Sequence, residues 1–269
     1  MSIISIRSRV SGRKKFILSL LPFVFFMSVY FVSSHVRHAE NPEDKIIPLP
    51  SSLLEGFKEV AFHPDRRGEY LLWEDTFASG RRFAISILLL LPAFYLGAYM
   101  GLFPKIEAIF YRFFAFLDKI PPMGVLPVLF VLLNVGEPLK LGLIILGVAP
   151  TLALDAFIRT KEIHKEQIVK GMTLAATDFE IVHRIVLPQI WPNLCNTLKL
   201  NYKAILFCLL AAESTGGQVG LGYRTFVLMR YTAMYKIIPY VIWMSLLVFL
   251  LYFVTSWLIN KKYTWQATT

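Results

Sequence analysis

Long apolar runs separated by polar stretches dominate the pattern of this chain. Six of the runs are long or apolar enough to cross a membrane, which takes about 20 helical residues each. They lie at residues 16–34, 83–103, 123–135, 139–157, 193–212 and 237–259. Their apolar positions are continuous, so they do not fit the alternating strands of about 10 residues that build a transmembrane barrel. We therefore expect an all-α polytopic membrane protein with six transmembrane helices, each of which satisfies its own backbone hydrogen bonds.

The stretch between the first two runs is polar. Residues 35–82 hold nine of the 18 acidic residues of the chain, and we expect them to form a periplasmic segment outside the membrane. Within this segment, Ser52 is followed three residues later by Glu55, which is a capping-box pattern. The pattern predicts a short helix over residues 52–61.

Glycines and prolines add detail to the apolar runs. Gly97 and Gly101 have the small-xxx-small spacing that permits close helix approach, although glycine is also common in membrane helices generally. Residues 104–119 are amphipathic and rich in aromatic side chains, which predicts an interfacial helix. Pro121 and Pro122 are expected to break the chain before the third run.

Composition and charge support membrane insertion. The chain is 56% apolar and 17% charged, against about 25% charged residues in a typical soluble domain. The formal net charge is +10, which we interpret as membrane topology rather than nucleic-acid binding. Cytoplasmic segments next to membrane helices are enriched in Lys and Arg. When the N-terminus is placed inside, the segments on the cytoplasmic side hold more of these residues than the segments outside. This orientation places both termini and residues 159–188 in the cytoplasm.

The first apolar run has a second interpretation, because a basic start followed by an apolar run is also typical of a secretory signal peptide. The run is longer than a usual signal core, and no small-x-small cleavage site follows it. We therefore expect a membrane anchor. The predicted organisation is a cytoplasmic tail at residues 1–15, the anchor at 16–34, the outer segment, a core at 83–260 and a cytoplasmic tail at 261–269.

Residues 159–188 form a polar loop between the fourth and fifth runs. A first helix is predicted over residues 162–175. Its apolar stripe consists of Ile163, Ile168, Met172, Ala175 and Ala176. A second capping-box pattern, from Thr177 to Glu180, predicts a new helix that ends at Pro188. The pattern alone fits either a loop that covers helix ends or a helix–turn–helix that docks into a partner.

The end of this loop carries a family motif. Ile185, Leu187 and Pro188 match the close of the Glu-Ala-Ala, Gly, Ile-x-Leu-Pro motif in membrane subunits of binding-protein-dependent ABC importers. Counting back places Val169, Lys170 and Gly171 where the family has Glu-Ala-Ala, and Ala175 where it has Gly. The second half of the motif therefore matches, and the first half does not.

Further landmarks occur in the same order as in permeases of the nitrate, sulfonate and taurine group. They extend the resemblance over roughly residues 50–265. Ile120-Pro121-Pro122 resembles the start of their third span, and residues 134–140 resemble their short outer turn. Ala212-Glu213 and Gly220-Leu221-Gly222-Tyr223 resemble their signature after the fifth span.

The resemblance implies a type I importer permease with a cytoplasmic coupling helix, in a bacterial inner membrane. It implies a dimer with itself or a related permease, two cytoplasmic ABC ATPase subunits that hold ATP and Mg, and a periplasmic or lipid-anchored binding protein. A small anion such as an oxyanion or sulfonate is the implied substrate. The chain has no Gly-x-x-x-x-Gly-Lys-Ser/Thr loop, so we expect no cofactor and no ATP hydrolysis in it. The alternative is a non-transporting scaffold or regulator on the same fold.

The resemblance also assigns contacts with the ATPase to residues of the loop. These are Val169, Lys170, Gly171, Met172, Ala175, Ala176, Thr177, Asp178, Ile185, Leu187 and Pro188. Two departures from the family pattern matter. Val169 cannot make the ionic contact of an acidic side chain, and a bend with positive φ costs more at Ala175 than at glycine.

Four residues near the fifth run are candidates for the transport pathway or its gate: Lys203, Glu213, Ser214 and Gln218. Lys203 lies about ten residues into the run, roughly 15 Å at helical rise. Burial in lipid is costly, so it is expected to face protein or water, where it attracts an anion or pairs with Asp155 or Glu213. Glu213 either caps the following Gly-rich turn or belongs to an outer gate. Cys195 and Cys208 are interpreted as packing thiols, not a disulfide or metal site.

Overall fold

The computed structural model describes residues 12–41, 44–65 and 68–263, and it contains helices but no strand in these ranges. In chain order the elements are α1 (Gly12–Glu40), α2 (Pro50–Phe62), α3 (Leu71–Leu102), α4 (Pro104–Leu117), α5 (Pro122–Leu133), α6 (Glu137–Lys161), α7 (Lys165–Thr173), α8 (Asp178–Glu180), the π-helix η1 (Ile181–Val186), α9 (Leu187–Leu200), α10 (Tyr202–Gly216), α11 (Leu221–Arg230) and α12 (Met234–Lys262). The all-α prediction is confirmed. The predicted tails lie largely outside the described residues, since 1–11 and 264–269 are not among them.

Four helices are long and apolar enough to span a membrane, and the number rises to six if two bent pairs each form one span. The four are α1, α3, α6 and α12. In the pair α4 and α5, the axes differ by 101°. Helix α5 has 12 residues, and a helix of that length extends only about 18 Å, less than the hydrocarbon core. Helix α5 alone is therefore too short to be the predicted third span, and with α4 it forms either a broken span or a re-entrant loop.

The fifth span differs from the single helix expected over residues 193–212. It consists of α8 to α9 followed by α10, with a 44° bend at the break. The bend lies at Asn201, a turn residue whose φ of −85° and ψ of −2° stay in the right-handed helical region but depart from ideal α-helical values. Both sides of the bend still pack into the bundle, because Leu198 before it and Tyr202 and Ile205 after it are buried.

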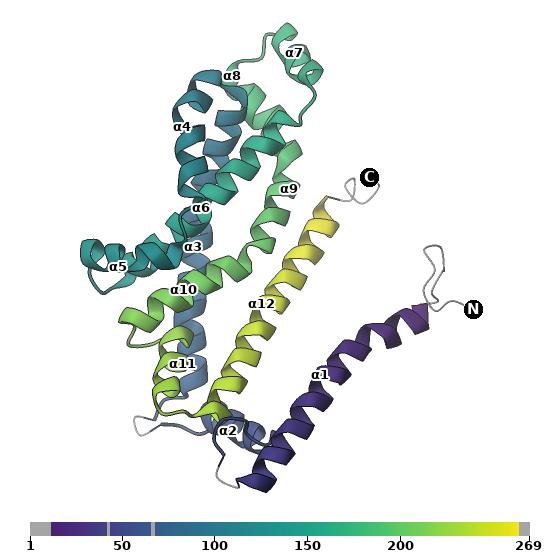
Figure 1. Ribbon diagram of the computed structural model, residues 1–269. Helices are drawn as coiled ribbons and strands as arrows, with labels where there is room; N and C mark the ends of the chain where they lie inside the picture. The colour runs from purple at the N-terminus through teal and green to yellow at the C-terminus, as the bar shows by residue number, and fades with distance from the viewer. Residues whose placement is uncertain (1–11, 42–43, 66–67, 264–269) are drawn as a thin grey trace.

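Helices α3 and α6 form the centre of the bundle (Figure 1). Gly97 lies directly against the backbone of Ala153 and the side chain of Ala156, and Gly101 lies against Thr160. A Cβ atom at either glycine would collide with these groups. The small-xxx-small spacing therefore marks a close helix contact, which is one of the two interpretations that the sequence left open.

Helix α3 begins at Leu71, 12 residues before the expected start of the second run at residue 83. The last residues of the predicted outer segment thus form the first three, polar turns of α3. Hydropathy does not predict these turns as part of the membrane helix, because they carry charged residues. Leu72, Asp75, Ser79 and Arg82 are nevertheless buried at helical spacing, in line with the apolar core positions that follow.

Helix α2 is present, but it begins differently from the prediction. Leu49 precedes the first turn without a side-chain hydrogen bond, and Pro50 occupies the first helical position. The fixed φ of proline suits that position, where its missing N–H is not needed. The capping box expected from Ser52 to Glu55 therefore does not form, because both residues already lie inside the helix.

Helix α1 diverges from the bundle, and its apolar side chains are exposed along its length (Figure 1). Its end is tied to the following segment by hydrogen bonds from Tyr30 Oη and Ser34 Oγ to the carbonyl oxygen of Pro48, at 2.7 and 3.0 Å. Helix α2 then packs against the start of α12, where Gly56 lies against Tyr235. The contacts described for the anchor thus join it to the following segment at its C-terminal end.

Candidate functional site

The loop of residues 159–188 is two short helices held together at a tight bend. Ala175 adopts φ +57°, the left-handed conformation that is costly for a residue with a Cβ atom. Its neighbour Ala176 donates a backbone hydrogen bond to Gly171, which satisfies the end of α7. The bend occurs where the family motif has glycine. Ala175 therefore adopts the same kind of bend, although a left-handed backbone is less favourable for alanine than for glycine.

The second capping box is formed as predicted. The Thr177 hydroxyl accepts a hydrogen bond from the Glu180 backbone at 3.3 Å, and the Glu180 carboxylate accepts one from the Thr177 backbone at 3.1 Å. Gly171 allows α7 to lie against this second arm, since a Cβ atom there would meet Ile185 at 2.8 Å. The two arms therefore form one compact unit.

Two details of the loop differ from the prediction. The first helix is shorter, Lys165–Thr173, because α6 continues to Lys161 and a turn follows it. Pro188 does not end the second helix but lies in the first turn of α9. The π-helical turns Ile181–Val186 precede it, and the chain stays helical from Asp178 to Leu200.

The predicted apolar stripe divides into a buried and an exposed part. Ile163, Ile168 and Ala176 pack against the bundle. Four other apolar side chains project from the loop, here termed the exposed tip: Val169, Met172, Leu174 and Phe179, at 55, 56, 83 and 65% exposure. Lys170, Asp178 and Pro188 are also exposed, whereas Gly171 and Leu187 are buried and Ile185 is half-buried. These last three support the loop from within and offer little surface to a partner.

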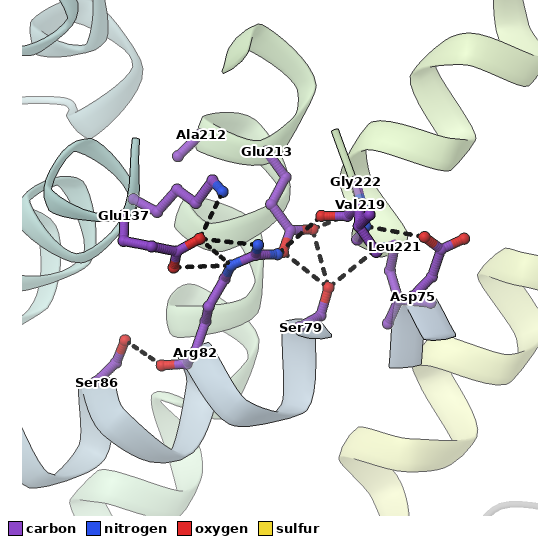
Figure 2. A network of polar contacts seen from close by, with 12 residues as sticks. Asp75, Ser79, Arg82, Ser86, Glu137, Ala212, Glu213, Val219, Leu221 and Gly222 are labelled. Atoms are coloured by element: carbon purple, nitrogen blue, oxygen red, sulfur yellow. Dashed lines mark hydrogen bonds and ion pairs between the residues drawn. The ribbon is translucent and has the colours of Figure 1, made fainter. Parts of the chain in front are cut away.

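A second site surrounds Arg82 of α3 (Figure 2) and adjoins the turn before α11, which lies at the opposite end of the bundle from α7 (Figure 1). The guanidinium donates hydrogen bonds to Glu137 at 2.9 to 3.0 Å, to Glu213 at 2.7 Å and to the carbonyl oxygen of Val219 at 2.9 Å. Glu213 is fully buried. A buried carboxylate is stable only when it is paired and hydrogen-bonded, and Arg82 supplies both.

Glu213 also binds the segment that follows α10. Its carboxylate accepts hydrogen bonds from Ser79 Oγ at 2.8 Å and from the Gly222 backbone at 2.9 Å, and Ser79 Oγ accepts one from the Leu221 backbone. Gly220 has φ +139°, and a Cβ atom there would collide with the carboxylate. Glu213 thus binds the Gly-rich turn, which is one of the two roles the sequence left open.

Asp75 fixes the same turn from the other side (Figure 2). It accepts hydrogen bonds from the Gly220 backbone at 2.9 Å, from Arg224 at 2.8 Å and from the Tyr240 hydroxyl at 3.1 Å. Burial opposes the charge of Arg224, but the hydrogen bond and charge of Asp75 outweigh it and raise the pKa of this guanidinium. Arg224 therefore remains cationic.

We term these groups the outer charge network. Its carboxylates are Asp75, Glu137 and Glu213, and its cations are Arg82, Lys140 and Arg224. Positive and negative groups are equal in number, as burial in a low-dielectric site demands. The six charged groups join α3, α6, α10 and α11, and the hydrogen bond from Tyr240 to Asp75 connects α12 to them.

Sequence reasoning found only part of this network. Glu213 was a candidate for the transport pathway or its gate. Glu137 and Lys140 belong to residues 134–140, which resemble the short outer turn of the family. Asp75, Ser79 and Arg82 were missed, because they were assigned to the outer segment. The signal was their spacing of four and three residues, which continues to Ser86 and places all of them on one helix face.

Comparison with known proteins identifies the family. Residues 93–261 match the model for the binding-protein-dependent transport system inner membrane component. The chain belongs to this family. The matched range contains the loop of residues 159–188 together with Glu137, Glu213 and the Gly-rich turn. Asp75, Ser79 and Arg82 precede it.

Several curated relatives are permeases. The taurine transport system permease protein TauC of Escherichia coli is 25% identical over 178 residues, which cover 66% of this chain and 64% of that protein. A probable ABC transporter permease protein of Brucella melitensis is 27% identical over 154 residues, covering 56% and 61%. A putative ABC transporter permease protein of Methanocaldococcus jannaschii is 24% identical over 180 residues, covering 65% and 67%. The chain thus spans a little under two thirds of the length of the first two.

The other candidates for the pathway of this family member are placed as follows. Lys203 is exposed on α10 and bonds to neither expected partner, since Asp155 binds Thr197 and Arg159, and Glu213 binds the outer charge network. Of the two roles that the sequence left open for Lys203, pairing with Asp155 or Glu213 is therefore not formed, and contact with an anion stays a prediction. Ser214 donates a hydrogen bond to Ala211 of its own helix, and Gln218 is exposed beyond α10. Cys195 and Cys208 are both free thiols.

Proposed function

We propose that the chain is the membrane subunit of an ATP-driven importer. It forms the translocation pathway as a dimer, with a second copy or a related permease, and it couples to two cytoplasmic ATPase subunits that carry ATP and Mg. A binding protein delivers the substrate from the other side. Family membership supports this proposal, as does the similarity to permease proteins of ABC transporters. The taurine system among them favours a small anion, such as a sulfonate or oxyanion.

The observation that carries the proposal is the exposed tip. Val169, Met172, Leu174 and Phe179 present apolar side chains to solvent on one short loop. Contiguous exposed apolar surface on a folded protein marks an interaction site. The capping box and the close contact at Gly171 hold these side chains on a rigid base. A partner with an apolar socket would bury them without reordering the loop.

The same loop has a continuous helical connection into the bundle. The chain is helical from Asp178 through η1 and α9 to Leu200, and α10 follows after the bend. At its far end α10 carries Glu213 of the outer charge network. We infer that displacement of the exposed tip by the ATPase would move α9 and α10, and that the network would transmit this movement to α3, α11 and α12. Alternating access would follow from that movement.

Co-purification tests the docking step. Met172→Glu or Leu174→Glu places a charge in the exposed tip, so each should abolish recovery of the ATPase with the affinity-tagged chain. Lys105→Glu is the matched control, because this exposed residue in the first turn of α4 tolerates an acidic side chain. The control should recover the ATPase normally. Normal recovery with both tip variants would refute the docking proposal.

A further inference from the structure

A long groove separates α12 from α9 and α10. The two sides are bonded at one end of α12, where Tyr202 Oη lies 3.0 Å from Thr255 Oγ1 and Lys199 Nζ lies 2.9 Å from Ser256 Oγ. Beyond this contact a groove of about 540 Å³ opens along the helices. Leu206 and Leu210 line one side, and Val241, Val248 and Phe249 line the other.

Two lysines give the groove a polar end. Lys199 lies at the end of α9 and Lys203 at the start of α10, so the two lysines flank the bend at Asn201 on the groove wall, and no acidic residue lines the groove. The Lys199 amine rests over the Tyr252 ring, 4.9 Å from its centroid, and bonds to Ser256. The Lys203 amine has no hydrogen-bond or ion-pair partner among the described residues. An unpaired cation in a membrane-spanning segment is expensive, so an anion that meets Lys203 would lower its free energy.

The depth of the lysines decides what kind of anion fits. Ser256, the partner of Lys199, precedes Lys261 by five residues on α12, which corresponds to roughly 8 Å at 1.5 Å per residue. Lys261 and Lys262 end the helix in the pattern of a membrane surface. Lys199 is therefore near the head groups, and the flexible side chain of Lys203 reaches toward them from one turn deeper. The apolar part of the groove extends from there toward the middle of the membrane.

We propose that this groove binds one anionic phospholipid. Its phosphate lies between Lys199 and Lys203, and one acyl chain fills the space between α10 and α12 along Leu206, Leu210 and Val248. The charged head and apolar tail match the two ends of the groove. A free inorganic anion would leave the apolar walls uncovered, and an apolar helix of a second copy would leave both lysines without a counter-charge. The proposal depends on membrane insertion and is independent of ATP-driven transport.

Lipid titration of the purified full-length chain in neutral detergent tests the proposal. Native mass spectrometry with phosphatidylglycerol and phosphatidylcholine should show one tightly bound phosphatidylglycerol and no equivalent phosphatidylcholine. The double variant Lys199→Met with Lys203→Met should weaken phosphatidylglycerol binding by about thirty-fold, as two lysines near a lipid surface imply. Lys261→Met, at the end of the same helix, should leave the affinity unchanged.

A second pair of variants keeps both lysines. Ser245 and Leu246 are adjacent and exposed on α12, but only Ser245 lines the groove. Ser245→Trp should fill the groove and remove tight phosphatidylglycerol binding, whereas Leu246→Trp should not. Equal binding of the two lipids, or unchanged binding in both the double lysine variant and Ser245→Trp, would overturn the proposal.

Two further outcomes would also overturn it, and each identifies another occupant. Inorganic sulfate that raises the thermal unfolding temperature as much as phosphatidylglycerol does, and is blocked by Lys203→Met, would assign the groove to a free anion. Efficient oxidative cross-linking between two copies that carry Ser245→Cys, in a background without Cys195 and Cys208, would assign it to a second copy.

Discussion

Arg82 shows how much one residue determines in this protein. It pairs with Glu137 and Glu213 and binds the carbonyl oxygen of Val219, so it joins three separate elements. Its neighbour Arg81 is exposed. Two adjacent arginines therefore have opposite environments, and hydropathy alone gives both the same value. Only the buried spacing of Asp75, Ser79 and Arg82 along α3 separates them.

Removing Arg82 should be severely destabilising. Arg82→Met leaves Glu213 buried without a cation, which costs about 3–5 kcal/mol when one partner of a buried pair is lost. Thermal unfolding of the purified chain in detergent should show this loss, and Arg81→Met should behave as wild type. Adding Glu213→Gln should restore part of the stability. Wild-type stability in Arg82→Met would contradict the buried pairing.

The backbone conformation of Gly220 gives a second prediction at the scale of single residues. Its φ of +139° is accessible to glycine, and a Cβ atom would meet the Glu213 carboxylate. Gly220→Ala should therefore lower the unfolding temperature clearly. Gly80→Ala is the control, because no atom lies within 4 Å of a Cβ atom there. Alanine favours the helix by about 0.5–1 kcal/mol at such a site, so the control should be neutral or slightly stabilising.

At the scale of elements, the sequence predicted the apolar helices and the second capping box, but not their boundaries. Apolar runs predicted α6 and α12 well because hydropathy covers most of each helix. The early start of α3 was missed because its first turns bury charged groups rather than apolar ones. The bend at Asn201 and the π-helix before Pro188 were missed because no local motif specifies them. Both depend on how the chain packs against α3 and α6.

The packing of α3 on α6 makes an element-scale prediction. Gly97→Val should force the two helices apart, since its side chain would enter the space of Ala153 and Ala156. Overpacking a close contact typically costs about 1–3 kcal/mol. Size-exclusion chromatography of the detergent-solubilised chain should show reduced monodisperse yield, compared with Gly80→Val at an open helical position. Equal yields of the two variants would show that the contact is not limiting.

At the scale of the whole molecule, the distribution of Lys and Arg predicts a definite orientation. Both termini and the loop of residues 159–188 are expected in the cytoplasm, and α2 outside. Ser51 of α2 and Thr173 of α7 are both exposed and suit single-cysteine labelling in a background without Cys195 and Cys208. A membrane-impermeant thiol reagent should label Ser51→Cys in intact cells, and Thr173→Cys only after permeabilisation. The reverse result would invert the proposed topology.

Sequence and structure together place the two candidate sites at opposite ends of one bundle. The loop could be predicted from its motif, whereas half of the outer charge network could not, because Asp75, Ser79 and Arg82 are joined to Glu213 only by tertiary packing. The helical path through η1, α9 and α10 connects the two sites. That connection is the physical basis for proposing that ATP hydrolysis by a partner drives transport through this subunit.

Uptake into proteoliposomes tests this central claim most directly. The complex purified through the tagged chain is reconstituted with ATP inside, and labelled taurine, nitrate or sulfate is added outside with a periplasmic extract of the host as the source of binding protein. We predict that at least one of these anions accumulates only with ATP, and that Met172→Glu abolishes its accumulation while Lys105→Glu does not. A complex that hydrolyses ATP but accumulates none of the three would contradict the transport proposal and favour a scaffold.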